Sequence, residues 1–290
     1  MPRMHRRTAL LASVTPFLPA VVHAAAGSAT PTELSDLFRT WVDRQLVVPQ
    51  DELPLYQRLA EAELARAQAD VSHPQYVLVV DRCAWVQAAL LFWRSGDGLH
   101  GLVGATPVST GRPGTFDHFE TPRGAFEHTS ANPDFRAEGT YNRQGIRGYG
   151  AKGLRVYDFG WQTVPKGWGD GAALEMRLQM HATDPDALEH RLGSVQSKGC
   201  IRIPATFNRF LDHYGVLDAE YEQLASTGRR VAVLKADRET VADAGRYLVV
   251  VDSGRLERPA WSPGPGANSS PAGTGSPRAP SPQTRSKLVN

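Results

Sequence analysis

The stretch LEMRLQMH at residues 174–181 carries the clearest strand pattern in this sequence. Successive side chains of a strand point to opposite faces of the sheet. One face of this strand is therefore apolar and consists of Leu174, Met176, Leu178 and Met180. His181 ends the strand on the opposite, polar face, from which it can line a cleft.

Further strand patterns lie on both sides of this stretch. Runs rich in β-branched and aromatic residues, bounded by turn residues, indicate strands. They fall at residues 76–80, 84–92, 99–108, 154–161, 231–234 and 247–251. The sequence therefore predicts one mainly β domain with short helices over residues 75–252.

Two segments ahead of this domain have the spacing of helices. Apolar residues recur at a helical period between residues 31 and 45, and a second helical segment runs from 54 to 69. About 45 residues is small for an independent domain. We therefore expect residues 27–74 to be an N-terminal helical segment that packs on the β domain.

The two ends of the chain have the composition of segments outside the folded domain. Three arginines precede an apolar run at residues 9–22, and three alanines follow it, so residues 1–26 are typical of a secretory signal peptide. From Pro259 onward the chain is rich in Pro, Ser and Gly, and we expect residues 253–290 to be a disordered tail. These features predict an exported protein of the periplasm or cell wall, with the Sec and twin-arginine routes both open.

Charge and cysteine content exclude several classes of protein. The net charge of the 290 residues is +2, of which residues 1–26 contribute +3 and residues 253–290 contribute +4, so that residues 27–252 carry −5. A mildly acidic domain without a basic or aromatic repeat argues against nucleic-acid binding. Two cysteines are too few for a disulfide-rich miniprotein.

Cys200 lies in the motif SKGCIR at residues 197–202, nineteen positions after His181. We expect a short helix over residues 184–193 to turn the chain back and bring the two residues together. Cationic neighbours favour the thiolate form of cysteine, so the pair fits a nucleophile and its base. Two other roles for Cys200 remain open at this point, a buried core residue and a disulfide with Cys83.

Four short motifs follow one another in a specific order. VSTGRPG at 108–114 and TPRGAF at 121–126 precede His181, which is followed after fifteen residues by SKGCIR at 197–202. In this order and spacing they resemble the L,D-transpeptidases of bacterial cell walls, whose YkuD-type catalytic domain has a Thr-Pro-x-Gly turn and a Ser/Thr-His-Gly-Cys signature. The resemblance covers roughly residues 75–252.

The resemblance implies a β-sandwich-like catalytic domain and a two-step acyl transfer on peptidoglycan stem peptides, without a metal or an organic cofactor. Cys200 is then the nucleophile, His181 the general base and the Gly199 carbonyl the acceptor that orients His181. Ser197 and backbone N–H groups near the thiol line the oxyanion site. Arg202 stabilises the motif loop or a substrate carboxylate.

Lys198 departs from the family pattern, which most often has His at this position. A lysine at its ordinary pKa does not act as a neutral base. We expect its charge, two residues before Cys200, to favour the thiolate or to meet a substrate carboxylate.

Other candidate residues are less specific. His118 and His128 lie in loop sequences, and no spacing ties them to the motif, so we interpret them as ordinary polar loop residues. The glycines between 145 and 153 lack the sequence of a phosphate loop. They predict instead a mobile loop that borders the site with Arg143, Arg147 and Lys152.

The sequence as a whole predicts a monomeric, exported L,D-transpeptidase. Its acceptor is a second stem peptide, a lipoprotein or a free D-amino acid. One alternative is an L,D-carboxypeptidase or endopeptidase of the same fold, in which water replaces the amine. The other is a non-catalytic wall-binding protein in which Cys200 forms a disulfide with Cys83.

Overall fold

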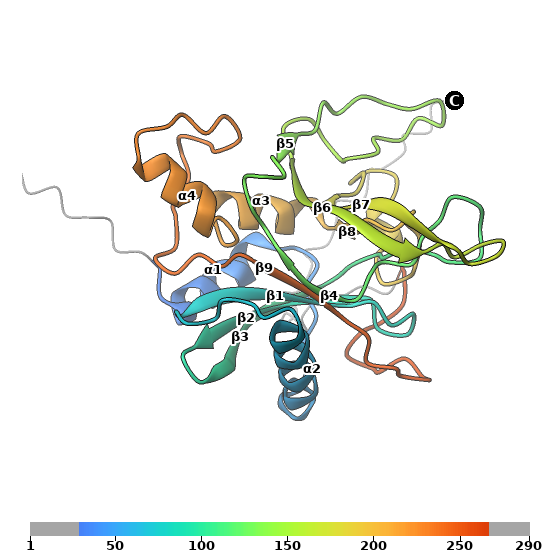
Figure 1. Ribbon diagram of the computed structural model, residues 1–290, viewed down its shortest axis with the longest axis horizontal. Coiled ribbons are helices and arrows are strands. Elements are labelled where there is room, and N and C mark those ends of the chain that lie inside the picture. Colours follow the sequence, from blue (N-terminus) through green and yellow to red (C-terminus); the bar gives the residue numbers. More distant parts are fainter. Residues whose placement is uncertain (1–28, 267–290) are drawn as a thin grey trace, which may run out of the picture.

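Two β-sheets form the centre of this protein, whose computed structural model describes residues 29–266 (Figure 1). The first sheet has the strand order β3-β2-β1-β9-β4. Neighbouring strands in it are antiparallel, except that β1 and β9 run parallel. Its strands are β1 (Gln75–Asp81), β2 (Ala88–Ser95), β3 (Gly98–Pro107), β4 (Gly124–Glu127) and β9 (Tyr247–Val251).

The second sheet has the order β5-β6-β7-β8 and contains the predicted strand at 174–181 as β7. β6 and β7 form an antiparallel hairpin, whereas β7 and β8 are parallel, with His181 opposite Arg202. Parallel strands need a crossover connection, and this one contains the short 3₁₀ helix η2 (Glu189–Arg191). The strands are β5 (Phe135–Arg136), β6 (Arg155–Pro165), β7 (Ala173–Ala182) and β8 (Ile201–Ile203).

The predicted N-terminal helical segment is present. The Thr30 hydroxyl accepts the Glu33 N–H, and the Glu33 carboxylate accepts the Thr30 N–H, a capping box that starts α1. The 3₁₀ helix η1 then leads into α2. The helices in the described part of the chain are α1 (Pro31–Trp41), η1 (Gln50–Glu52), α2 (Leu53–Arg66), η2, α3 (Ala205–His213) and α4 (Ala219–Ser226).

The two faces of the first sheet pack against different layers. Leu78 on one face shares a core with Met180 of β7, together with apolar residues of α1 and α3. Val79 on the other face packs with Tyr56 of α2 in a second core. Figure 1 shows α2 on the side of the first sheet away from β6 to β8. The second sheet therefore buries one face and leaves the face of His181 for a site.

The fold is mixed α/β rather than mainly β, because the described chain is 20% helix and 27% strand. α3 and α4, which follow β8 in the chain, were not predicted. Residues 231–234 form turns, so the strand predicted there is wrong. The helix predicted over 184–193 shortens to η2, because the Gly193 N–H bonds the Val108 carbonyl (2.7 Å) and draws the chain out of the helix.

The predicted tail starts later than expected. Residues 253–266 pack against the domain, with Trp261 only 9% exposed and its ring 6.0 Å from that of Tyr56. The Ser262 hydroxyl donates to the Val86 carbonyl (2.6 Å). A single large apolar side chain thus anchors a segment whose average composition is that of a linker.

Both predicted terminal segments extend beyond the described residues. The signal peptide predicted at 1–26 lies outside them, as do residues 267–290 of the tail. Between residues 29 and 266, no helix has both the length and the apolar character needed to cross a membrane.

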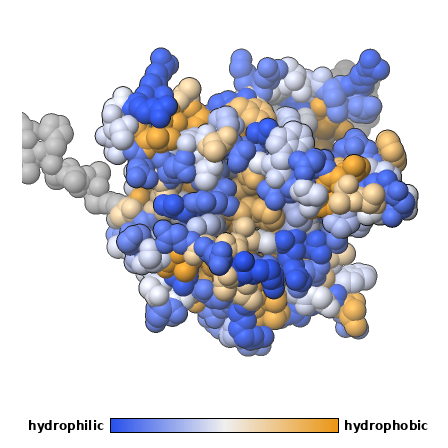
Figure 2. Space-filling model, viewed as in Figure 1, coloured by the Kyte–Doolittle hydropathy of each residue, from blue (hydrophilic) through white to orange (hydrophobic). Residues whose placement is uncertain are grey.

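Exposed apolar side chains occur around the second sheet. Trp161 of β6, Leu174 of β7, Phe135 of β5 and Tyr149 are each at least 39% exposed. Figure 2 shows a mostly hydrophilic surface on which apolar residues form small, separate patches. The side of the protein seen there therefore lacks the large continuous apolar face that marks a permanent interface.

Candidate active site

The motif at 108–114 lies directly beside the Cys200 motif at 197–202. Ser109 and Arg202 exchange two backbone hydrogen bonds of 2.9 and 2.8 Å and form an isolated antiparallel bridge. This bridge joins the end of the first sheet to β8 of the second. The loop that carries the thiol is therefore held by both sheets.

Thr121 brings the third motif to the same place. Its hydroxyl accepts the Gly111 N–H (2.8 Å) and donates to the Gly199 carbonyl (2.8 Å). A Cβ on Gly111 would lie 2.0 Å from the Phe119 carbonyl oxygen, so only glycine fits there. The motifs on which the family resemblance rests thus form one structural unit.

Gly199 makes the turn that leads into Cys200. Its φ is +126°, a conformation that residues with a Cβ rarely adopt, and a Cβ would lie 2.8 Å from Met176 Cε. The turn directs the Cys200 side chain toward the edge of β7.

The Cys200 thiol continues the hydrogen-bond ladder of β7 beyond the start of β8. Its Sγ lies 3.9 Å from the Arg177 carbonyl oxygen, and the Gln179 N–H also bonds the sulfur. β8 begins only at Ile201, so these two groups of β7 have no β8 backbone partner beside them. The sulfur takes the place that a backbone group of a longer β8 would occupy.

Burial raises the pKa of the Cys200 thiol. The Gln179 N–H and the Arg202 guanidinium act in the opposite direction, and the Asp158 carboxylate acts with burial. The net direction is upward, which favours the neutral thiol at rest, although the cationic neighbour Arg202 acts toward the thiolate as expected. A base must therefore remove the proton before the sulfur can attack.

His181 is suited to be that base. Its Nδ1 lies 2.8 Å from the Ala182 carbonyl oxygen, which assigns the ring proton to Nδ1 and leaves the Nε2 lone pair free. Burial lowers the pKa of His181 to about 4, so the imidazole is neutral at pH 7. His181 is opposite Arg202 of β8, and Cys200 directly precedes β8, two residues before Arg202.

Tyr149 completes the surroundings of the pair and was not singled out from the sequence. Its ring lies edge-on to that of His181, with centroids 4.8 Å apart, and its hydroxyl donates to Gln179 Oε1 (3.1 Å). Burial raises the pKa of Tyr149, and the charge of Cys200 raises it further. The hydroxyl is therefore close enough to the thiol to sense its ionisation.

The loop that carries Tyr149 is anchored at the end of β7. The Arg147 backbone N–H and Nη2 each lie 2.8 Å from the Asp184 carboxylate, and Arg147 also pairs with Asp186. The hydrogen bonds from Arg147 hold the pKa of Asp184 well below its usual range. The prediction that this loop borders the site is confirmed, with Arg147 as its anchor.

Ser197 braces the motif loop. Its buried hydroxyl donates to the Cys200 carbonyl and accepts the Gly199 N–H (3.0 Å). Its single proton is therefore directed to the backbone in this structure. The oxyanion role of Ser197 stays a prediction.

The predicted orienting role of Gly199 is wrong. Its carbonyl accepts the Thr121 hydroxyl, because the turn at Gly199 directs it toward that residue. The Ala182 carbonyl, which follows His181 directly in the chain, orients the imidazole instead.

Lys198 pairs with Asp117 across the neighbouring loop, and its side chain is 62% exposed. The hydrogen bond from Lys198 lowers the pKa of Asp117. The cation predicted to act on the thiol is therefore balanced at the surface by a carboxylate.

The Arg202 side chain lines a pocket of about 660 Å³ next to the motif loop. The Coulomb interaction with Cys200 raises the pKa of Arg202 against the larger effect of its own burial. The backbone of Arg202 thus stabilises the motif loop, and its side chain faces a space that can hold a ligand.

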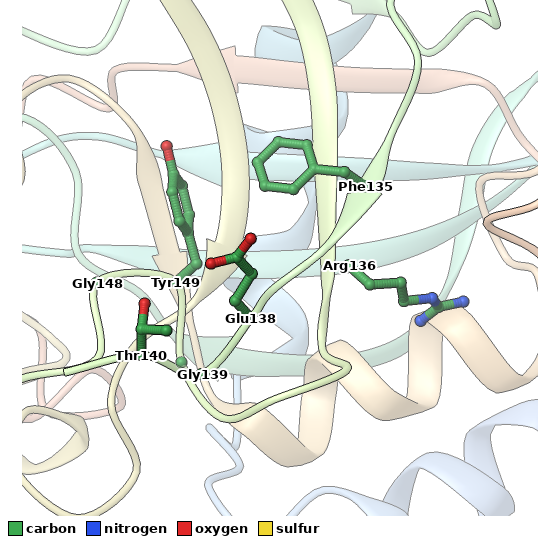
Figure 3. A pocket seen from close by; sticks show the side chains of 8 residues that line it. Phe135, Arg136, Glu138, Gly139, Thr140, Gly148 and Tyr149 are labelled. Atoms are coloured by element: carbon green, nitrogen blue, oxygen red, sulfur yellow. The ribbon is translucent and has the colours of Figure 1, made fainter.

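A second pocket, of about 440 Å³, lies on the other side of the Tyr149 loop (Figure 3). The Tyr149 ring, Phe135 and the Glu138 carboxylate lie around it. Arg136 extends away toward α3, where it pairs with Asp212 (2.6 Å). The carboxylate of Glu138 is therefore the exposed charge of this pocket.

The alternative roles of the other candidates can now be assigned. Cys83 and Cys200 are both free thiols, and Cys83 Sγ lies 3.4 Å from the Arg255 carbonyl oxygen, so the alternative disulfide is not formed. His118 Nδ1 lies 2.9 Å from the Phe116 carbonyl oxygen in its own loop. His128, interpreted as an ordinary loop residue, is fully buried, and that interpretation is wrong.

Comparison with known proteins adds no assignment. No protein-family model matches the chain, and no curated protein matches it. The function is therefore inferred from the residues and the geometry described above.

Proposed function

We propose that this protein is a cysteine-dependent L,D-transpeptidase acting on peptidoglycan stem peptides, on a β-sandwich-like domain of the YkuD type. The observation that carries the proposal is the convergence of three separate motifs on one thiol beside a neutral imidazole. Thiol acyl transfer requires a cysteine nucleophile and a base that can take its proton.

The first step forms a thioester. His181 Nε2 takes the proton of Cys200 as the sulfur attacks the carbonyl carbon at the L-to-D bond of a tetrapeptide stem. When the tetrahedral intermediate collapses, the carbon–nitrogen bond breaks and His181 gives the proton to the departing amine. Because the imidazole is neutral beforehand, it can accept this proton at pH 7.

The second step reverses the first with a new amine. The acceptor amine attacks the thioester, His181 removes its proton, and the thiol leaves with that proton. The acceptor is a second stem peptide, a lipoprotein or a D-amino acid. Water in its place gives the hydrolytic alternative.

One donor near the thiol supports the stabilisation of the oxyanion. Arg202 Nε is buried and has no hydrogen-bond partner, and Arg202 interacts with the charge of Cys200. Donors held in place in a site that excludes water stabilise a developing oxyanion strongly. Because Ser197 and Tyr149 direct their hydroxyl protons to the Cys200 carbonyl and to Gln179 Oε1, we assign this role to Arg202.

The test is incubation of the purified protein with soluble tetrapeptide muropeptides and a D-amino acid, followed by mass spectrometry. Exchange or cross-linking supports a transpeptidase, and loss of the terminal residue alone supports the hydrolase. Cys200→Ala and His181→Ala should each lower the rate on the order of 10²-fold or more. Cys83→Ala is the matched control, because Cys83 is the other free thiol and lies at the end of β1.

A wall-binding protein without activity would give a different result. The proposed mechanism would be contradicted if Cys200→Ala formed product as fast as the parent protein. It would also be contradicted if the parent protein bound wall fragments without any turnover. Intact-mass measurement after mild alkylation shows in parallel whether Cys200 reacts in the folded protein.

A further inference from the structure

Three arginines line the 660 Å³ pocket beside the motif loop: Arg112, Arg191 and Arg202. Between residues 29 and 266 none of the three forms an ion pair. The Arg112 side chain donates a hydrogen bond to the Thr115 hydroxyl, at 3.5 Å. We call this group the tri-arginine pocket. Its three cations lie together with no protein anion to balance them.

Arg202 is the least favourable of the three for the folded protein alone. Its Nε is buried without a hydrogen-bond partner. Burial lowers the pKa of Arg202, and the nearby charge of Arg191 lowers it as well. A buried, unpaired cation next to another cation costs stability. A bound anion removes that cost, whereas nothing in the packing of the domain does.

The remaining lining fits an organic anion. Asn142 and Gln196 add amide groups to the rim, and Ile146, Leu188 and Val195 add an apolar wall. A guanidinium binds a carboxylate through two parallel hydrogen bonds, so three guanidinium groups exceed what one carboxylate can use. The set matches a short chain that carries two carboxylates.

We propose that the tri-arginine pocket is a subsite for a substrate end with two free carboxylates, and that it discriminates against the amidated form. The inference rests on the proposed function, which supplies a peptide substrate to this site. Arg202 lines the pocket, and its charge also interacts with that of Cys200. The subsite therefore lies next to the reacting thiol. Amidation removes the charge that the pocket recognises.

The second pocket fixes the direction in which such a substrate lies. Gly148 lines both pockets, and the second one carries the exposed Glu138 carboxylate, whereas its arginine, Arg136, is paired with Asp212 (Figure 3). A carboxylate end is attracted to one side of the Tyr149 loop and repelled from the other. The substrate therefore crosses the site in one orientation.

Binding of glutarate, a five-carbon dicarboxylate, tests the subsite without requiring turnover. Isothermal titration calorimetry of the full chain at low salt should show that glutarate binds and that glutaramide, its neutral diamide, does not. Arg191→Gln and Arg112→Gln should each weaken glutarate binding by about tenfold. Arg230→Gln, which removes an exposed arginine after α4, is the charge-matched control and should leave binding unchanged.

A second measurement uses the thiol as a reporter. Iodoacetate and iodoacetamide alkylate cysteine in the same way and differ by one negative charge. The rate with iodoacetate divided by the rate with iodoacetamide should be higher at Cys200 than at a free cysteine in solution. Arg191→Gln should lower this ratio by about threefold or more.

Equal binding of glutarate and glutaramide would overturn the subsite, as would an Arg191→Gln protein that behaves like Arg230→Gln. These outcomes do not depend on the reaction that the protein catalyses. With muropeptides, preference for the free-acid over the amidated stem supports the subsite. Glutarate binding without any muropeptide turnover would keep the subsite and reject the transpeptidase.

Discussion

Two of the places where the described chain buries charged or ionisable groups differ in how the charge is balanced. In the first, which we call the paired cluster, Arg155 lies 2.6 Å from Asp134 and 2.7 Å from Asp218, and His128 lies 3.0 Å from Asp134. Burial lowers the pKa of His128, but the Asp134 carboxylate outweighs this effect, and the pKa is raised overall. Each charged group there has an opposite charge in contact.

The second place is the candidate active site. Arg202 has no anionic side chain in contact among the described residues, and His181 bonds only a backbone carbonyl. The pKa of His181 falls to about 4 and that of Cys200 rises, so both groups rest in their neutral forms.

The balanced charges of the paired cluster stabilise the fold, whereas the unbalanced groups of the candidate active site are available for chemistry. Paired buried charges connect β6 to α3 and to Asp218 at the start of α4, and each cation there is balanced by a carboxylate. Unbalanced groups lower the stability of the free protein and keep their capacity for a proton or an anion. The four predictions below test this contrast, from the largest expected effect to the smallest.

Removing one partner of the paired cluster should strongly lower the stability of the protein. We expect Asp134→Ala to lower the free energy of unfolding by about 3–5 kcal/mol, since it leaves the buried Arg155 and His128 short of an anion. Urea denaturation measures the change, and Asp134→Asn should be milder. Asp186→Ala, at an exposed partner of Arg147, is the control and should cost less than about 1 kcal/mol. Equal losses would erase the contrast.

The neutral His181 should make the protein less stable in acid. Its folded pKa of about 4 lies below the ordinary 6.5, so between these values the unfolded chain binds a proton that the folded protein does not. The free energy of unfolding therefore falls as pH falls, by about 2 kcal/mol from pH 6.5 to 5 for this group. His181→Gln should flatten the slope, and exposed His73→Gln should not. Matching slopes for all three proteins would contradict a neutral His181.

Loss of the Tyr149 hydroxyl should affect rate more than stability. We expect Tyr149→Phe to lower kcat/KM about 3- to 10-fold while changing the free energy of unfolding by less than about 1 kcal/mol, because the ring keeps its contact with His181. Tyr141→Phe, in the same loop over Arg147, is the matched control. An unchanged kcat/KM would remove Tyr149 from the reaction.

Lys198 should have the smallest effect. Because Asp117 balances it at the surface, Lys198→Ala should change the rate of Cys200 alkylation by less than about threefold, under 1 kcal/mol of barrier. Asp117→Ala should be equally mild. A larger fall confined to Lys198→Ala would restore the role predicted from the sequence.

Elements with a strong local pattern could be predicted from the sequence. β7 and β9 have a single interpretation, and α1 begins at the Thr30 capping box. α3 was missed although Phe207, Phe210 and Leu211 recur in it at helical spacing, whereas α4 has a weaker pattern with Tyr221 as its buried residue. Trp261 was overlooked because its partner Tyr56 is distant in the chain.

The candidate site was predictable only in part. Cys200 and His181 follow from motif spacing; in the structure His181 lies in β7 and Cys200 directly precedes β8, the strand paired with it. The hydrogen-bond partners of Ser197 and Gly199 depend on Thr121 and on a turn with positive φ. The sequence alone does not show to which groups these side chains and carbonyls point. Contacts between distant loops are invisible to spacing arguments.

β9 comes late in the chain, yet it lies between β1 and β4 inside the first sheet. Its parallel pairing sets Val77 opposite Tyr247, and contacts between such distant residues form slowly because a long loop must close first. Until β9 is in place, β4 has no partner strand, and Thr121 just before it is not held against Gly199. The surroundings of the Cys200 loop are thus assembled from segments that lie far apart in the chain.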